Sequence, residues 1–72
     1  MKHERIEINP EVMVGKPVIK GTRIPVDMIL RKLGAGISIE EILEDHPHIT
    51  REDIRAAQAF AADYISKETA TG

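Results

Sequence analysis

The sequence of 72 residues contains no cysteine, so neither a disulfide nor a thiolate metal site can form. It also lacks any long apolar run. We therefore expect no signal peptide and no membrane span, and the cytoplasm is the expected location. What remains is a globular composition, with 42% hydrophobic and 31% charged residues. A domain of this length buries only about 60% of the surface of its unfolded chain, so we expect a partner, most simply a second copy in a homodimer.

The sequence also has little of what catalysis or cofactor binding requires, because so short a chain leaves little room for a dry pocket. Gly34-Ala35-Gly36 lacks the preceding strand and the pattern of a phosphate-binding loop. His46 and His48 have no third ligand at a recognisable spacing, and we interpret them as solvated loop residues. We expect a protein that is not an enzyme, with no catalytic, cofactor-binding or metal-binding residue, no cofactor and no small-molecule substrate.

The net charge of −2 does not favour strong non-specific DNA binding, but the charge is unevenly distributed. Residues 1–36 carry +3 and residues 37–72 carry −5, while the segment 16–32 alone carries +4. This pattern has two interpretations of similar weight. It describes either two solvated faces of opposite sign, or a basic patch for nucleic acid together with an acidic patch for a basic partner.

Residues from about 4 to 25 are predicted to form a β arm or hairpin. Ile6-Glu7-Ile8 alternates as a short strand does, and Val18-Ile19-Lys20 is β-branched and apolar. Between them, residues 11–14 fit either one helical turn or an extended segment. An isolated hairpin is marginal in water, so the arm must pack on the rest of the chain or on a second copy.

Three helices are predicted beyond the arm, near residues 26–33, 39–45 and 51–66. Gly34 is expected to terminate the first helix. Ser38 with Glu41, and Thr50 with Asp53, form capping boxes for the other two. Residues 67–72 are expected to form a flexible tail. The predicted fold is mainly α: a single domain over residues 1–66 with a three-helix helix-turn-helix core, in which the third helix carries an apolar stripe made of Ile54, Ala57, Phe60, Ala61, Tyr64 and Ile65.

The segment Gly15-Lys16-Pro17-Val18-Ile19-Lys20-Gly21-Thr22-Arg23-Ile24-Pro25-Val26 resembles the signature of a bacterial and archaeal family known as domain of unknown function 433. The helix starts at residues 36–43 and 49–57 fit the same family, and the resemblance covers residues 4–66. It implies a homeodomain-like helix-turn-helix with an N-terminal β arm. Members look like antitoxins of the VapB type, typically encoded beside a small PIN-like ribonuclease toxin.

The motif residues carry roles that we infer from their chemistry. Gly15 and Gly21 permit backbone geometry that a Cβ would forbid, and Pro17 fixes φ at the start of a strand. Thr22 is expected to bond to the local backbone. For Arg23 we favour a structural contact with a carbonyl or carboxylate across the arm over a contact with phosphate or a partner.

The leading functional hypothesis is therefore an antitoxin-like protein that binds and neutralises a PIN-like ribonuclease toxin, with operator DNA as a second target. The alternatives are a stand-alone DNA-binding transcriptional regulator and a structural oligomer with no nucleic-acid role. If the third helix reads DNA, its first turns face the bases; otherwise it is a core and dimer helix. The candidate nucleic-acid contacts are Lys16, Lys20, Arg23, Arg31, Lys32, Arg51 and Arg55.

Overall fold

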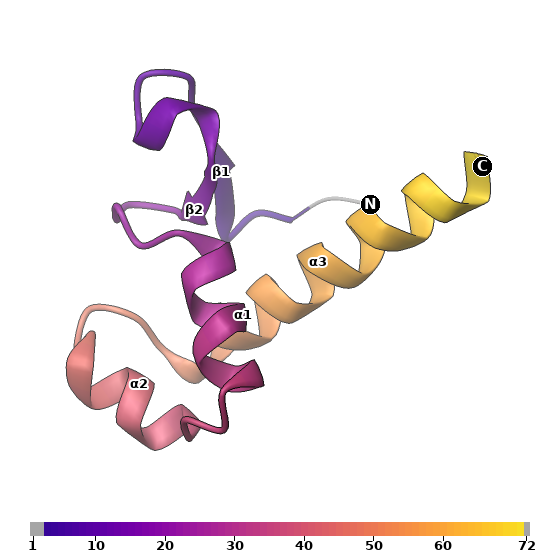
Figure 1. Cartoon of the computed structure of the whole chain (residues 1–72). Helices are drawn as coiled ribbons and strands as arrows, with labels where there is room; N and C mark the ends of the chain where they lie inside the picture. The colour runs from indigo at the N-terminus through magenta and orange to yellow at the C-terminus, as the bar shows by residue number, and fades with distance from the viewer. Residues whose placement is uncertain (1–2, 72) are drawn as a thin grey trace.

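The computed structural model describes the backbone of residues 3–71 and the side chains of residues 3–67. Two short strands precede three helices. The strands are β1 (Ile6–Ile8) and β2 (Pro17–Ile19), and the helices are α1 (Val26–Gly34), α2 (Ile39–Asp45) and α3 (Arg51–Thr71). Figure 1 shows the hairpin at one end of α1 and α2 at the other, while the C-terminal half of α3 projects away from both. The predicted mainly helical fold with an N-terminal hairpin is confirmed.

The two strands pair antiparallel, with Ile6 opposite Ile19 and Ile8 opposite Pro17. A further bridge joins Val18 to Pro25, so the chain folds back once more before α1 begins. Val18 and Ile19 are both buried, and Ile19 belongs to the same hydrophobic cluster as residues of all three helices. The hairpin is therefore held by the helical core, as its small size requires.

The end of α1 differs from the expectation. Gly34 is the last residue of the helix, and the left-handed residue is Gly36, with φ of +88°. The Gly36 N–H donates to the Leu33 carbonyl, and the Ile37 N–H donates to the Lys32 carbonyl. This pair of bonds is a Schellman motif with Gly36 at C′. The assignment of Gly34 to that position was wrong because the helix runs one residue further than its apolar pattern indicates.

Both predicted capping boxes lie at helix starts. The Ser38 Oγ accepts the Glu41 N–H at 3.1 Å. At α3, the Thr50 Oγ1 accepts the Asp53 N–H at 3.2 Å, while the Asp53 Oδ2 accepts the Thr50 N–H at 3.0 Å. This second box satisfies two backbone donors reciprocally.

The third helix is longer than predicted, because residues 67–71 continue α3 instead of forming a flexible tail. Gly72 lies outside the described residues. Twenty-one residues correspond to a helix about 30 Å long. Among the described residues, no helix combines the length and apolarity that crossing a bilayer requires.

The core lies where strand β2 meets the three helices, and each of these four elements supplies a fully buried isoleucine. Ile19 comes from β2, Ile29 from α1, Ile42 from α2 and Ile54 from α3. Val26, Ile49 and Ala57 complete this cluster. Only part of the predicted apolar stripe of α3 belongs to this core: Ile54 and Ala57 are buried, whereas Tyr64 and Ile65 are exposed.

Candidate interaction surfaces

The turn after β2 is built by the motif residues. Gly21 has φ of +82°, which only glycine adopts without strain. The Thr22 Oγ1 donates to the Ile19 carbonyl at 2.7 Å and accepts the Ile24 N–H at 3.0 Å. The hydroxyl thus adds a second hydrogen bond to the Ile19 carbonyl, which also accepts the Thr22 N–H, and supplies the acceptor for the Ile24 N–H. The turn holds Lys20 and Arg23 on the surface.

The loop between the strands has an unusual backbone. Met13, Val14 and Gly15 all have positive φ, at 52°, 55° and 80°, and form one short 3-10 turn. Of the two conformations left open by the sequence, the segment thus adopts a single helical turn, but with left-handed backbone angles. A left-handed conformation costs a residue with a Cβ about 1–2 kcal/mol. The Val14 side chain is nevertheless 97% exposed, so nothing within the described chain compensates for that cost by packing on it.

Within the segment 16–32, three of the predicted nucleic-acid contacts face carboxylates of the chain itself. The Lys16 Nζ lies 3.2 Å from the Asp27 Oδ2, and the Arg31 Nε lies 3.9 Å from the same oxygen. The Lys32 Nζ lies 3.7 Å from Asp45 on α2. These exposed ion pairs contribute little to stability, but they reduce the positive charge that the segment 16–32 can offer to phosphates.

Lys20 and Arg23 differ from these three residues. Both side chains are exposed, and neither makes a hydrogen bond or ion pair within residues 3–67. The carbonyl or carboxylate contact that we favoured for Arg23 is therefore not found. The turn after β2 is the part of the basic segment with charge available for an external partner.

At the start of α3, Arg51 is tied to α2 through an ion pair between its guanidinium and the Glu40 carboxylate. The hydrogen bond from Arg51 lowers the pKa of Glu40 below the ordinary glutamate value, assisted by a backbone hydrogen bond and by the Arg51 charge. Arg55 is exposed and makes no side-chain contact of this kind within the described chain. Of the seven candidate cations, four are thus paired with carboxylates, and the seven do not form a single basic surface of unpaired charge.

A polar cluster that sequence reasoning missed links the N-terminal arm to α3. Asp53 is only 7% exposed, and its Oδ1 accepts a 3.0 Å hydrogen bond from the Arg5 guanidinium. Its other oxygen caps the helix through Thr50. The sequence identified the capping role of Asp53, but no local signal identifies Arg5, which lies 48 positions away.

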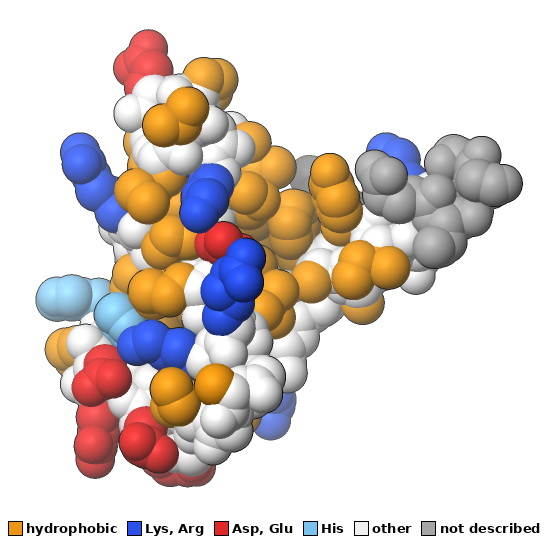
Figure 2. Space-filling model, in the orientation of Figure 1, with side chains coloured by type: hydrophobic (Ala, Val, Ile, Leu, Met, Phe, Trp, Pro, Cys, Tyr) orange, Lys and Arg blue, Asp and Glu red, His pale blue; other side chains and the backbone are white. Residues whose placement is uncertain are grey.

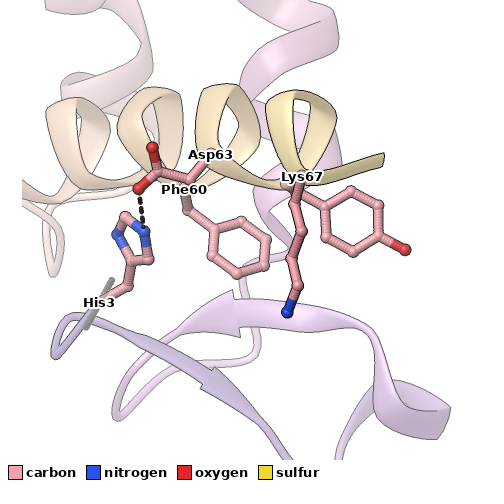
Figure 3. A pocket seen from close by; sticks show the side chains of 5 residues that line it. His3, Phe60, Asp63 and Lys67 are labelled. Carbon is pink, nitrogen blue, oxygen red and sulfur yellow. Dashed lines mark hydrogen bonds and ion pairs between the residues drawn. The ribbon is translucent and has the colours of Figure 1, made fainter. Parts of the chain in front are cut away.

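His3 makes a second link of this kind. Its Nε2 lies 2.8 Å from the Asp63 Oδ2, and its ring meets Phe60 edge-on with centroids 5.5 Å apart. Figure 3 shows the imidazole pointing from the N-terminal segment to α3, with Phe60 beside it in an open pocket that Tyr64 and Lys67 also line. The pair and the ring contact fasten the start of the chain to the middle of α3.

The loop between α2 and α3 holds the remaining histidines. His48 is exposed, but His46 is half-buried, and its Nε2 is buried without a hydrogen-bond partner among the described atoms. The expectation of a solvated His46 is therefore wrong for its Nε2, since the residue sits at the C-cap of α2, where its N–H donates to the Ile42 carbonyl, and this ring nitrogen is shielded from solvent. Within the described part of the chain, no three His, Asp or Glu side chains gather in a way that could hold a metal ion.

Four carboxylates crowd the short helix α2. Glu40 and Asp45 have the cationic partners described above, whereas Glu41 and Glu44 are exposed and have none within residues 3–67. Figure 2 shows acidic side chains gathered over the α2 end of the molecule, away from the hairpin. We call this set, Glu40, Glu41, Glu44 and Asp45, the acidic α2 surface.

An apolar groove lies on another part of the molecule, between the hairpin, α1 and α3. It has a volume of roughly 390 Å³, and its apolar lining is Ile8, Pro17, Val26, Leu30, Phe60, Ala61, Tyr64 and Ile65. Figure 2 shows hydrophobic side chains running from the hairpin onto the projecting part of α3. We call this the apolar groove. Among the described residues that line it, only Asp27 is charged, and Asp27 is engaged with Lys16 and Arg31.

The protein is a small helical domain with an N-terminal hairpin. Its helices α1 to α3 surround one isoleucine-rich core, and its β arm ends in the Gly21–Thr22 turn. The chain belongs to the family described as "Protein of unknown function (DUF433)", whose model matches residues 6–61. The resemblance carried by the segment Gly15–Val26 is thereby confirmed.

Two relatives and one solved structure are similar to the chain. Uncharacterized protein y4eO of Sinorhizobium fredii is 38% identical over 58 residues, which is 81% of this chain but 26% of that protein. An uncharacterized protein of Archaeoglobus fulgidus is 68% identical over 28 residues, 39% of this chain and 78% of that protein. The crystal structure of a DUF433 member protein from Anabaena variabilis has a TM-score of 0.77 at 33% identity, covering 92% of this chain and 68% of that chain. The chain thus spans about a quarter of the length of y4eO.

Proposed function

We propose that the chain is an antitoxin-like binding protein that neutralises a PIN-like ribonuclease by placing the acidic α2 surface in the nuclease's RNA-binding cleft. The observation that carries this proposal is the presence of Glu41 and Glu44 on one short helix, exposed and without cationic partners within residues 3–67. A cleft that binds the RNA backbone is cationic, so an acidic surface is complementary to it and competes with the substrate. The family resemblance described from the sequence supports the same target class.

The first test is co-expression with the neighbouring reading frame. Growth arrest by the neighbour alone, relieved by this chain, is the expected result. A neighbour that is not toxic, or toxicity that this chain leaves unchanged, contradicts the proposal.

The second test locates the surface. The variant E41Q/E44Q removes both free charges while keeping a glutamine that can still complete the capping box with Ser38. We expect inhibition of the nuclease to weaken several-fold at low salt, mainly through a slower association rate, with a smaller difference at high salt. The matched control E4Q/E11Q also removes two exposed charges, but from the arm, and should inhibit as the native chain does. Equal loss in both variants contradicts the assignment to α2.

A second candidate function is operator binding, which Lys20 and Arg23 favour because both are exposed and neither side chain is paired within residues 3–67. A gel-shift series at two salt concentrations tests it, because each lost phosphate contact reduces the log–log salt slope by about 0.9. We expect K20Q/R23Q to bind more weakly and with a shallower slope. No binding of the native chain at low salt contradicts this function, and no binding to DNA or nuclease leaves the structural oligomer as the remaining hypothesis.

A further inference from the structure

We propose that the apolar groove is a homodimer interface, in which the projecting half of α3 from a second copy of this chain packs into the groove and the exchange is reciprocal. This inference does not depend on the proposed antitoxin function, because it concerns a different face from the acidic α2 surface. It assigns a specific surface to the second copy that the small size of the chain led us to expect.

The exposed surface area supports a second copy as the occupant. A folded monomer of 8.0 kDa is expected to expose about 4,450 Å², whereas this chain exposes 5182 Å². The excess of roughly 700 Å² is close to the ~800 Å² that one partner contributes to a standard protein interface. The radius of gyration agrees, since it is 12.3 Å against about 11 Å for a compact domain of this length.

The position of the excess surface identifies the face. Ile8, Tyr64 and Ile65 are among the most exposed large hydrophobic residues, at 59%, 58% and 61%, and all three line the apolar groove. Figure 1 shows that the helix carrying Tyr64 and Ile65 extends beyond the body of its own subunit. A helical segment of this kind gains its stability from packing an apolar face, and the Tyr64 and Ile65 side chains are left more than half exposed by the described residues.

The groove is suited to a two-fold arrangement because α3 is both its wall and its proposed occupant. In a two-fold interface the same patch on each copy contacts its counterpart. Two α3 helices that cross near Ala61 can approach closely, because alanine leaves room for the opposing backbone. Tyr64 and Ile65 of each copy then cover Ile8 and Pro17 of the other.

The strained loop lies at the edge of the same face. Gly15 lines the apolar groove, and Val14 beside it projects into solvent in a left-handed conformation. Strained residues of this kind persist where the surroundings require them. A second copy seated in the groove supplies an apolar surface against which Val14 can pack.

The test uses the purified full chain without any nuclease. Light scattering at about 100 µM is expected to give a mass near 16 kDa, twice that of the 8.0 kDa chain. I65K is expected to shift the mass to that of the monomer, because it places a charge in the groove. A62K is the matched control, since Ala62 is exposed on the same turn of α3 but does not line the groove. A monomeric native chain, or a dimer that both variants leave intact, overturns the proposal.

A second measurement applies if I65K fails to fold. The chain has no cysteine, so the single substitution A61C gives a unique thiol at the proposed crossing. Mild oxidation should link A61C into a covalent dimer at least tenfold faster than A62C, and cross-linking of A62C at an equal or higher rate overturns the crossing. Because E41Q/E44Q should leave the mass unchanged, failure of the dimer and failure of the antitoxin function give different results. A monomer whose groove binds only a co-expressed nuclease also overturns the second-copy assignment.

Discussion

Asp53 provides the sharpest test of how the arm is joined to the helices, through the substitution Asp53→Ala. The change removes the cap on the Thr50 N–H, which is worth about 1 kcal/mol. It also removes the ion pair with Arg5, whose side chain is 53% exposed, so we assign that pair only about 0.5–1 kcal/mol. A carboxylate in the first turn of α3 contributes another ~0.3–1 kcal/mol. The expected loss is about 2–3 kcal/mol, or about 10–20 °C in Tm.

Urea denaturation at one fixed protein concentration measures this loss, since the stability of an oligomer depends on concentration. A double-mutant cycle with R5A isolates the ion pair, and we expect a coupling free energy of ~0.5–1 kcal/mol. A D53A variant within about 0.5 kcal/mol of the native chain refutes the reasoning. So does strict additivity of D53A and R5A, because it means that the hydrogen bond between the arm and α3 contributes nothing.

Three further substitutions test other contacts. G36A places a Cβ on the left-handed C′ residue and should lower the free energy of unfolding by about 1 kcal/mol, as measured by urea denaturation. G34A lies inside α1 and should raise it by ~0.5–1 kcal/mol. Equal effects of the two substitutions contradict the Schellman assignment. T22V should cost about 1–2 kcal/mol by removing the hydroxyl that bonds twice to the backbone, while T22S should retain most of the stability. E40Q should lower the free energy of unfolding at pH 7 but not in acid. The pKa of Glu40 is lower in the folded state than in the unfolded state, so its carboxylate stabilises the fold above the unfolded pKa, and this stabilisation is lost as the pH falls through the folded pKa. A pH-independent difference from the native chain contradicts the role of the Glu40 carboxylate.

The helices and their starts could be predicted from the sequence because their signals are local. Ser38 and Thr50 each lie three residues before an acidic residue, and the structure places each at the N-cap of a helix. The C′ residue of α1 was predicted two residues too early, because Gly34 and Gly36 both fit that position and only the backbone hydrogen bonds distinguish them. The end of α3 was missed because residues 67–71 have no apolar periodicity, yet they continue a helix already formed.

The candidate surfaces were less predictable, because they depend on which distant residues meet. From the sequence, we expected Lys16, Arg31 and Lys32 to be available to a partner. The fold instead places the carboxylates of Asp27 and Asp45 beside them. The left-handed turn at Met13 and Val14 could not be predicted, because these residue types favour backbone conformations with negative φ. The apolar stripe of α3 was visible in the sequence, but only the structure distinguishes the buried Ile54 and Ala57 from the exposed Tyr64 and Ile65.

The links from the arm to α3 have a consequence for how the chain acquires its fold. Arg5 and His3 have their partners 48 and 60 positions later in the sequence, so these partners are made after them during synthesis. An arm without α3 is a two-stranded hairpin, which is unstable alone. A chain interrupted before Asp63 is therefore expected to lack a stably packed arm and to be open to proteolysis, so the third helix must extend at least to Asp63 before the arm can be fixed in place.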